Sequence, residues 1–443
     1  FVGDPFPTGP NGAKGVGEVA LIPVMAAFAN AIYAATGAEI HNIPMTRERI
    51  LQSLRDKDCL LYTSPSPRDG CSVAYFLSKT GASVTVLERG DTAFGTAGAS
   101  GGLINWITCG ETQMELFMRS QDMLEHLQEE LGADFELNYN SYNMQIISNQ
   151  IEWDASAQLV NDFKLPGFEA KLIDSYESHL LEPCVTEDML GSIYVPRVHY
   201  LNPIKFALAY RNAAVKHGAK FVNGAEVTEI LHEGARVIGA KAKGECWYAG
   251  TTINCTGVWS EKVSAMAGST APIHPIRGEF AITEPVKHFC NTTISSAQYQ
   301  TIVQHPELFP AAAIKYNLGF SVEQTSTGAC IIHGTREMNS GLDNGVIPEV
   351  IELLIQTACK FIPKLGTLRI MRTYAGVRPG TPDGDPYIGL VSGVPGFCEC
   401  CGHGGEGIAL SPATGEAIAE LLIDGHTKHC DISRFSPDRV GKA

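Results

Sequence analysis

An acidic residue at the end of a predicted strand has the chemistry to hold the ribose of a dinucleotide. The β-branched run Ser83–Glu88 predicts a strand, and the run 70–81 before it is apolar at helical spacing and closed by a glycine. Glu88 lies 18 residues after Gly70, near the spacing of about 20 that separates the glycine turn from the ribose-binding acid in dinucleotide-binding units. A glutamate at a strand end is often only a solvated charge, so Glu88 alone does not identify such a site.

The turn before Gly70 departs from the glycine pattern that a dinucleotide site needs. If Leu60–Ser64 is the first strand, the three glycine positions of the GxGxxG pattern fall on Pro65, Pro67 and Gly70. Backbone N–H groups at these positions normally bind the pyrophosphate at the N-terminus of a helix. Proline has no N–H and holds φ at about −65°, so the two prolines predict weakened pyrophosphate binding.

Several later segments combine small residues with tight turns. Ala99–Gly102 offers a loop whose backbone can lie against a planar ring, and Asn254–Trp259 follows a predicted strand with another turn. Near the C-terminus, the segments 374–389 (YAGVRPGTPDGDPYIG) and 401–415 (CGHGGEGIALSPATG) are rich in glycine. Each turn alone is more often structural, but their order and spacing after Glu88 favour a common site.

Together with Pro275–Glu279, these segments resemble the D-amino-acid oxidase and glycine or sarcosine oxidase family of flavoproteins. The resemblance runs from Gly70 to about Ser433, and the two C-terminal segments make it specific at the family level. It implies an α/β fold in which a Rossmann-like FAD-binding domain carries an inserted, sheet-rich (α+β) substrate domain. It also implies FAD as the cofactor.

The resemblance implies roles for individual residues. Arg378 matches the arginine that holds the substrate carboxylate over the flavin, and a guanidinium group that binds a carboxylate through two hydrogen bonds fixes the Cα–H toward the hydride acceptor. In the alternative interpretation, Arg378 is a salt-bridge partner in a turn. His403 follows the family pattern, but we assign it no chemistry. The residues expected to bind FAD are Gly70, Glu88, Ser100, Gly101, Gly102, Val227, Thr256, Gly257, Trp259, Gly402, Gly404, Gly405, Gly407 and Ile408.

Alternating helices and strands predict a nucleotide-binding domain interrupted by a sheet-rich insertion. The FAD-binding domain is expected to comprise residues 70–134, 200–264 and 374–433, and the substrate domain residues 135–199 and 265–373. Within them we expect helices at 111–131, 203–217, 349–361 and 407–422, and strands at 220–222, 227–231, 237–242, 251–254 and 368–373. The 407–422 helix would begin in the glycine-rich turn, where its positive N-terminus stabilises negative charge on the reduced flavin.

Residues 1–57 differ in character from the rest of the chain. The glycine-rich loop Thr8–Glu18 and the segment Pro44–Ile50 resemble the C-terminal tail of the molybdopterin subunit of xanthine dehydrogenase-type hydroxylases, whereas the pattern alone favours a structural turn. The resemblance implies that Glu18 is the base beside a molybdenum centre. Because the pterin-binding regions are missing, we expect a helical fragment without that activity.

Residues 58–69 are expected to be a junction between the two pieces. The segment Cys59–Asp69 (CLLYTSPSPRD) resembles translated sequencing-adaptor sequence, which predicts that the chain is a composite of unrelated parts. The alternative is a Ser/Pro linker between domains.

Charge and cysteine usage narrow the class of protein. The 33 Lys and Arg against 48 Asp and Glu give a net charge of −15, which disfavours nucleic acid and anionic membrane surfaces as partners. The 13 Cys are scattered and no secretory signal is recognised, so we expect reduced thiols and a cytoplasmic location. The apolar stretch Val19–Ala35 contains Pro23 and Asn30, so we interpret it as a buried helix and expect no membrane span.

Three closely spaced cysteines, Cys398, Cys400 and Cys401, suggest a metal or iron–sulfur site. Their spacing is not that of a usual cluster motif, and no matching second pair follows. We therefore expect no metal, and interpret these residues as small buried hydrophobic side chains in a strand.

These features predict an FAD-dependent enzyme that oxidises the carbon–nitrogen bond of a small amino acid, namely glycine, sarcosine or a D-amino acid, by hydride transfer from Cα to the flavin. The expected oxidant is oxygen or an electron-accepting partner protein. One alternative is a flavin subunit of an amino-acid or opine dehydrogenase, and another is an inactive chimeric chain. A molybdenum hydroxylase is disfavoured because the sequence contains no pterin-binding region.

Overall fold

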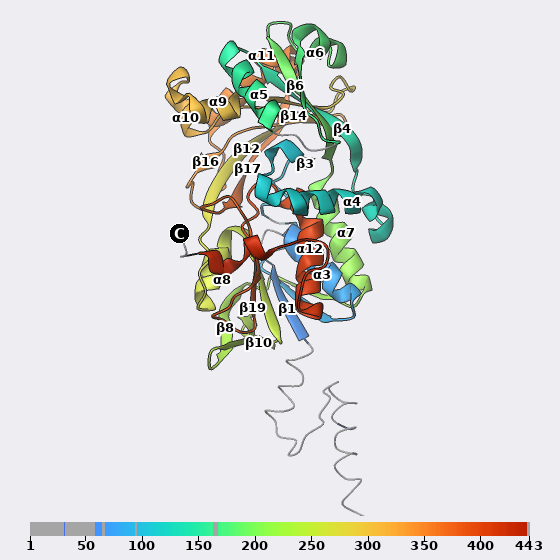
Figure 1. Cartoon of the computed structure of the whole chain (residues 1–443), viewed down its shortest axis with the longest axis vertical. Helices are drawn as coiled ribbons and strands as arrows, with labels where there is room; N and C mark the ends of the chain where they lie inside the picture. Colours follow the sequence, from blue (N-terminus) through green and yellow to red (C-terminus); the bar gives the residue numbers. More distant parts are fainter. Residues whose placement is uncertain (1–30, 32–57, 64–66, 94, 163–166, 441–443) are drawn as a thin grey trace, which may run out of the picture.

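The computed structural model describes residues 31, 58–63, 67–93, 95–162 and 167–440. Within these ranges the chain forms two large sheets, one in each half of Figure 1, and a small three-stranded sheet. The predicted N-terminal fragment, with Glu18 and the helix expected at Val19–Ala35, lies outside the described residues except for Ala31, which is helical.

The six-stranded sheet in the lower half of Figure 1 joins strands that are far apart in the sequence. Its order is β18-β19-β11-β1-β2-β7, and every neighbouring pair is parallel except β18 with β19. The strands are β1 (Asp58–Thr63), β2 (Ser83–Glu88), β7 (Lys220–Asn223), β11 (Thr251–Cys255), β18 (Tyr387–Leu390) and β19 (Phe397–Cys401). Parallel strands are covered on both faces, which explains why most residues of β2 and β11 are buried.

The first βαβ unit follows the predicted course. Helix α3 (Pro67–Lys79) connects β1 to β2 and is followed by Gly81, whose φ of 89° only glycine adopts readily. The two strands pair in register so that Thr63 lies opposite Glu88. Glu88 is therefore at the carboxyl end of the sheet, where open α/β sheets bind ligands.

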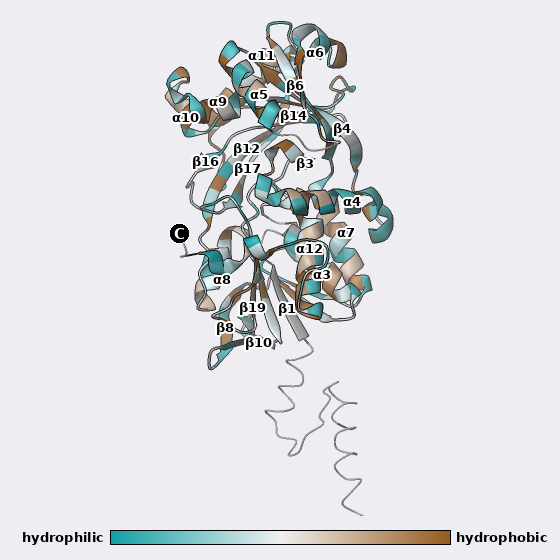
Figure 2. Ribbon diagram, viewed as in Figure 1, coloured by the Kyte–Doolittle hydropathy of each residue, from teal (hydrophilic) through white to brown (hydrophobic). Residues whose placement is uncertain are grey.

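Helix α3 packs against α7 (Pro203–Lys216) and α12 (Gly407–Asp424) beside this sheet, and Figure 2 shows hydrophobic residues along them. The Ser72 hydroxyl donates to the Ser411 carbonyl at 2.7 Å. A Cβ on Gly415 would lie 2.1 Å from the Ser72 Oγ, so this close contact requires glycine. Val73, Leu77 and Ile418 are among the fully buried residues of this core.

The three-stranded sheet and the remaining helices complete the lower half. The small sheet has the order β10-β9-β8. Its strands are β8 (Val227–Glu233), β9 (Arg236–Ala242) and β10 (Glu245–Tyr248). Helix α8 (Ser260–Met266) contacts β8, whereas α4 (Met114–Leu131) packs against α12 and α7.

The ten-stranded sheet in the upper half of Figure 1 is built from residues 103–200 and 274–380, so its segments alternate along the chain with those of the six-stranded sheet. Its order is β16-β12-β15-β14-β13-β4-β6-β3, with β17 paired to β12 and β5 to β6. The strands are β3 (Leu103–Ile104), β4 (Asn138–Ile147), β5 (Lys171–Asp174), β6 (Gly191–Tyr200), β12 (His274–Thr283), β13 (Thr293–Ser296), β14 (Ser321–Gln324), β15 (Cys330–His333), β16 (Glu337–Met338) and β17 (Ile370–Gly380).

Short helices accompany this second sheet. They are α5 (Gln150–Asp162), α6 (Ser175–Leu181), α9 (Gln298–Gln304), α10 (Ala311–Lys315) and α11 (Pro348–Phe361). The described 3-10 helices are η2 (Trp106–Thr108), η3 (Glu111–Gln113), η4 (Gly257–Trp259), η5 (Pro306–Leu308), η6 (Pro363–Thr367), η7 (Ser433–Phe435) and η8 (Pro437–Arg439). The predicted α/β class, with a sheet-rich second part, is confirmed.

Two predicted strands have different bounds in the structure. The first strand, expected at Leu60–Ser64, is Asp58–Thr63. The strand expected at Leu368–Thr373 is Ile370–Gly380, because it pairs with β12 along nearly its whole length. Arg378 therefore lies within a strand and not in the turn that its glycine and proline neighbours suggested.

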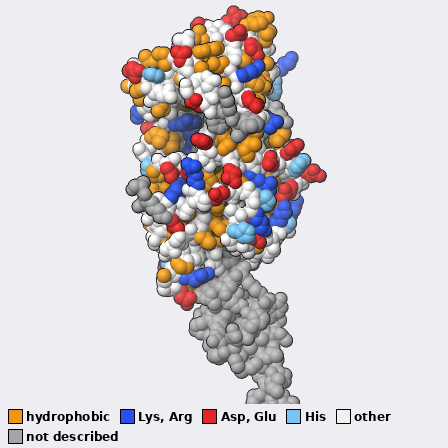
Figure 3. All heavy atoms as spheres, viewed as in Figure 1, with side chains coloured by type: hydrophobic (Ala, Val, Ile, Leu, Met, Phe, Trp, Pro, Cys, Tyr) orange, Lys and Arg blue, Asp and Glu red, His pale blue; other side chains and the backbone are white. Residues whose placement is uncertain are grey.

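The three clustered cysteines lie in β19 and are buried, as predicted. Among the described residues, no helix combines the length and the apolar character needed to cross a bilayer. Figure 3 shows Lys and Arg side chains interspersed with Asp and Glu on one face of the described chain, so this face has mixed charge rather than a continuous basic track.

Candidate active site

Glu88 lies at the predicted position, at the carboxyl end of β2. Its side chain is buried and accepts a hydrogen bond from the Gly90 N–H at 2.8 Å. The guanidinium of Arg89 lies 4.7 Å from the centre of the Trp259 ring, which brings the end of β2 together with the turn after β11. Two predicted FAD-binding residues, Glu88 and Trp259, are thus neighbours in space.

The turn after β11 is organised by Asn254. Its Oδ1 accepts from the Thr256 N–H at 3.2 Å and from the Thr256 hydroxyl at 2.7 Å, and its Nδ2 donates to Glu399 of β19 at 2.9 Å. Gly257 has a φ of 58°, which favours glycine. The turn is therefore held to the adjacent strand from inside the protein.

Val227 begins β8 next to the same edge. The loop before it is bound to the end of β2, because the Ala225 N–H donates to the Glu88 carbonyl at 2.7 Å. The Val227 side chain is buried with Leu87 in a small apolar cluster. Glu88, Val227 and the Thr256–Trp259 turn form one face of the sheet edge, consistent with a nucleotide lying across it.

The predicted phosphate loop is described only in part. Residues 64–66, including Pro65, lie outside the described residues, while Pro67 is the first residue of α3. The first helical position tolerates proline because its N–H has no partner within the helix. That same missing N–H is one that a helix N-terminus would offer to a phosphate. Gly70 is buried in the first turn of α3.

The glycine-rich turn before α12 requires its glycines. Gly402 has a φ of 80°, and a Cβ there would lie 2.5 Å from a methyl carbon of Thr381. Gly404 has a φ of 51°, and its N–H donates to the Pro379 carbonyl at 2.9 Å. Helix α12 begins at Gly407, where the sequence predicted its start, and Ile408 behind it is buried.

A cavity of about 350 Å³ lies between the glycine-rich turns and the second sheet. Six predicted residues line it, namely Ser100, Gly101, Gly102, Arg378, Gly404 and Gly405. The other predicted residues, Gly70, Glu88, Val227, Thr256, Gly257, Trp259, Gly402, Gly407 and Ile408, do not line it. The residues that would hold FAD thus fall into two groups, one that lines the cavity and one that does not.

The loop Ser100–Gly102 forms one wall of the cavity. Because two of its residues are glycines, its backbone can lie close to a flat ligand. A Cβ on Gly101 would lie 2.9 Å from the His333 Nε2, and a Cβ on Gly102, whose φ is 89°, would lie 2.0 Å from the Leu201 carbonyl oxygen. The Gly102 N–H donates to the Ser100 hydroxyl at 3.3 Å. Larger residues at 101 or 102 would force this wall to shift.

Arg378 reaches the cavity from β17, where its neighbour on β12 is Ile276. Its guanidinium passes over Gly278, since a Cβ on that glycine would lie 2.3 Å from the Arg378 Nη1. The same Nη1 donates to the Thr335 carbonyl at 3.4 Å. Glycine at 278 therefore makes room for the arginine, which is half-buried at the cavity wall.

Several of the cavity residues that were not predicted carry polar or charged side chains, and four of them matter here. Tyr299, His333 and Arg336 come from the insertion, and Glu406 follows Gly405 in the glycine-rich turn. His333 Nε2 lies 2.9 Å from Glu323 Oε2. Glu406 lies inside the glycine-rich segment 401–415 that the sequence analysis identified. No local sequence pattern marks Tyr299, His333 or Arg336.

The Tyr299 ring is inserted between two glycines. A Cβ on Gly319 would lie 2.7 Å from its Cζ, and one on Gly334 would lie 2.2 Å from its hydroxyl oxygen. The Arg336 guanidinium lies 4.9 Å from the ring centre. Burial raises the pKa of Tyr299 to about 12, partly opposed by Arg336 and Arg378, so this side chain is a neutral phenol at physiological pH.

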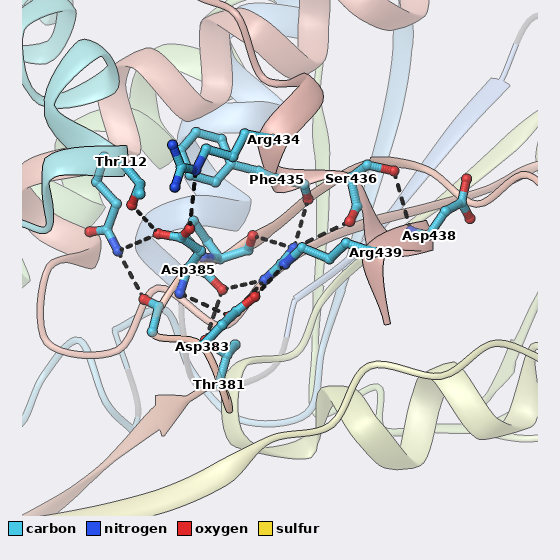
Figure 4. A network of polar contacts seen from close by, with 12 residues as sticks. Thr112, Thr381, Asp383, Asp385, Arg434, Phe435, Ser436, Asp438 and Arg439 are labelled. Carbon is cyan, nitrogen blue, oxygen red and sulfur yellow. Dashed lines mark hydrogen bonds and ion pairs between the residues drawn. The ribbon is translucent and has the colours of Figure 1, made fainter. Parts of the chain in front are cut away.

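The turn that follows Arg378 is fastened by the C-terminal segment (Figure 4). Arg439 donates to Asp383 Oδ2 at 2.7 Å and to the Asp385 carbonyl at 2.6 Å. The Thr381 hydroxyl donates to the same Asp385 carbonyl at 2.8 Å. Asp385 also accepts from Thr112, which precedes α4. The end of β17 is thereby tied to two other parts of the chain.

The glycine cradle at 101, 102 and 404, the buried Glu88 and the helix end at Gly407 fit FAD. The comparisons with known proteins agree. The model of the DAO family, described as FAD dependent oxidoreductase, matches residues 70–421.

Individual relatives cover most of the chain. It is 26% identical over 341 residues to hydrogen cyanide synthase subunit HcnC of Pseudomonas aeruginosa, covering 74% of this chain and 76% of that protein. It is 24% identical over 377 residues to glycine oxidase of Bacillus subtilis, covering 84% and 94%. Among solved structures, L-proline dehydrogenase from P. horikoshii is similar with a TM-score of 0.75 at 25% identity, covering 88% of this chain and 99% of that one.

The family match begins at Gly70. The predicted resemblance of residues 1–57 to a molybdopterin subunit is outside this match and outside the described residues, and none of these comparisons supports it. All residues that line the cavity lie within the part of the chain that the family model matches. The chain belongs to the DAO family of FAD-dependent oxidoreductases.

Proposed function

We propose that this enzyme oxidises the carbon–nitrogen bond of a small amino acid, namely glycine, sarcosine or a D-amino acid, while Arg378 holds the substrate carboxylate. The observation that carries the proposal is the position of Arg378 in the same cavity as the loop Ser100–Gly102 and the turn Gly404–Gly405. A guanidinium at that wall can anchor a carboxylate and leave the rest of a small substrate inside a volume of about 350 Å³.

The residues of this chain orient the reaction. FAD, when bound, supplies the acceptor for the hydride that leaves Cα. Arg378 holds the carboxylate by two hydrogen bonds, which restricts rotation of the substrate and directs Cα. The substrate becomes an imine, and water then converts it to an oxo acid and ammonia or an amine.

A second candidate function differs in the electron acceptor. The relatives include proteins named as oxidases and proteins named as dehydrogenases. We therefore keep the flavin subunit of an amino-acid or opine dehydrogenase as the alternative, with a partner protein in place of oxygen. Peroxide formation under air distinguishes the two, because only the oxidase passes electrons to oxygen.

The test is anaerobic reduction of FAD bound to the full chain, followed by stopped-flow absorbance. Glycine, sarcosine and D-amino acids are expected to bleach the flavin, whereas methylamine and other amines without a carboxylate are expected to react poorly. Equal rates for substrates with and without the carboxylate would contradict the role of Arg378. A flavin that none of these amino acids reduces would reject the proposed reaction.

A further inference from the structure

Glu406 brings a carboxylate into the otherwise cationic cavity. It precedes α12 and, among the described residues that line the cavity, it is the one acidic side chain, whereas Arg336 and Arg378 both line the same space. A Cβ on the adjacent Gly405 would lie 3.8 Å from the Arg378 Cδ. The acid and the proposed carboxylate anchor therefore belong to neighbouring parts of one wall.

The surroundings of Glu406 do not neutralise it. Its Oε2 lies 3.8 Å from the Cys109 Sγ, which donates to it, and no ion pair to Glu406 forms among the described residues. Burial raises the pKa of Glu406, while Arg336, Thr108 and Arg378 oppose the rise. Glu406 is half-buried, and a carboxylate in such a place without a direct ion-pair partner is suited to a cationic ligand.

The neighbouring titratable groups leave Glu406 as the acid of the cavity. Burial raises the pKa of the Cys109 thiol well above its usual value, and the Glu406 carboxylate raises it further. His333 is engaged with Glu323 at 2.9 Å. Of the three side chains, Glu406 is therefore the one that offers a carboxylate to an ammonium group.

A small amino acid carries the complementary pair of charges. Its carboxylate matches Arg378, and its ammonium group matches a carboxylate on the same wall. We propose that Glu406 binds the amino group of the substrate and takes one of its protons before Cα is oxidised. This inference rests on the proposed function and adds a residue that selects substrates carrying both charges.

The proton transfer balances within the cavity. An ammonium N–H bond breaks, its proton passes to the Glu406 carboxylate, and the nitrogen keeps the electron pair. The resulting neutral amine has a lone pair that can stabilise positive charge developing at Cα, which an ammonium group cannot do. A carboxylate whose pKa is raised by burial accepts the proton more readily than an exposed one.

Binding of an unreactive pair of ligands tests the assignment. 2-Aminoisobutyrate carries both charges but has no hydrogen on Cα, and pivalate replaces its amino group by a methyl group of similar size. Titration calorimetry on the full chain saturated with FAD gives both dissociation constants. Glu406→Gln is expected to weaken 2-aminoisobutyrate roughly 10- to 100-fold and to leave pivalate within about twofold.

Glu416→Gln, within the helix that Glu406 precedes, is the matched control, since Glu416 binds Arg119 at 2.6 Å outside the cavity. It should change neither constant. A Glu406→Gln chain that keeps its preference for 2-aminoisobutyrate, or a wild-type chain that binds pivalate equally well, would overturn the assignment.

The pH profile gives a second measurement. In the wild type, kcat/KM for a reactive amino acid should fall as the pH drops through the raised pKa of Glu406, because the protonated acid can no longer accept a proton. Glu406→Gln should lower kcat/KM and remove this acidic limb. An unchanged limb overturns the proton-transfer role. The absence of any flavin reduction rejects the proposed function instead, while the binding comparison still judges Glu406.

Discussion

In the proposed reaction, recognition of the substrate carboxylate depends on the guanidinium of Arg378. It lies next to Gly405 and over Gly278, where any side chain would crowd it. Its geometry is set by packing rather than by the flexible turn that the sequence suggested, so a substitution there should change binding without disturbing the loops that hold FAD.

Arg378→Ala should therefore spare FAD binding and remove most amino-acid oxidation. The loss of a charge-assisted carboxylate contact is worth roughly 2 to 5 kcal/mol, or about 30-fold to several thousand-fold in kcat/KM. Arg378→Lys should recover only part, because an ammonium group cannot reproduce the planar fork. Stopped-flow flavin reduction measures both effects.

Arg372→Ala on the same strand is the control, because Arg372 is exposed and lies over Tyr374 outside the cavity. Amines without a carboxylate should barely respond to either change at position 378. Unchanged reduction rates and apparent affinity in Arg378→Ala with an amino acid would remove this residue from the active site.

At the scale of elements, the end of β1 and the start of α3 decide how well the cofactor is held. Helix α3 begins at Pro67 and packs closely against α12, where Ser72 contacts Gly415. The helix is therefore positioned to bind a pyrophosphate, but a proline at its start cannot donate an N–H.

Replacing Pro65 and Pro67 by glycine should raise FAD occupancy. Each restored N–H donor to a phosphate is worth about 1.5 to 3 kcal/mol, or on the order of tenfold or more in the dissociation constant of FAD. Flavin absorbance per chain after gel filtration measures occupancy. Pro310→Gly, before α10, is the control. A wild-type chain that already retains stoichiometric FAD would show that the prolines do not impair the site.

The fastening of the 381–385 turn by Arg439 predicts a local stability effect. Arg439→Ala removes hydrogen bonds to Asp383 and to backbone carbonyls (Figure 4) and should destabilise the fold by about 1 to 3 kcal/mol. A lower midpoint of thermal or urea unfolding checks this. Lys364→Ala, an exposed residue elsewhere, should leave the midpoint unchanged.

The pH dependence of this effect has a definite sign. The hydrogen bond from Arg439 lowers the pKa of Asp383 below its ordinary value. A depressed carboxyl pKa contributes stability that is present above the unfolded pKa, about 3.9, and is lost as the pH falls through the folded value. The difference between wild type and Arg439→Ala should therefore shrink below about pH 4. A difference that grows in acid would contradict the assignment of Asp383 as the partner.

At the scale of the whole molecule, two sheets made of alternating chain segments enclose one cavity. The residues that line it come from both C-terminal motifs, from the loop after β2 and from the insertion. All of the described elements that build it begin at or after Asp58.

A chain from which residues 1–57 are deleted should consequently retain the flavin chemistry. FAD affinity, kcat and KM are expected to stay within about twofold once folding yield is accounted for. Because β1 begins at Asp58, deletion to residue 63 is the informative comparison and should abolish FAD binding. A fall in kcat for properly folded chain lacking residues 1–57 would show that the N-terminal piece takes part.

The local elements were largely predictable because their signals are short-range. Apolar periodicity and terminal glycines marked α3, α7 and α12 within a few residues, and the β-branched run marked β2. β17 was predicted too short, because Gly376, Pro379 and Gly380 weaken the local strand pattern. Its true length comes from pairing with β12, which lies about 100 residues earlier in the sequence.

By itself, the sequence determined the family and the cofactor and singled out Arg378 as the candidate carboxylate anchor, since these inferences depend on residue types at characteristic spacings. The tertiary structure alone decided which of those residues share the cavity and which new ones join them. Tyr299, His333 and Arg336 reach it through strand pairing and helix packing between distant segments, and no local pattern records such contacts. Glu406 stood inside a recognised motif, but only its burial beside two arginines marks it as a residue that can hold charge.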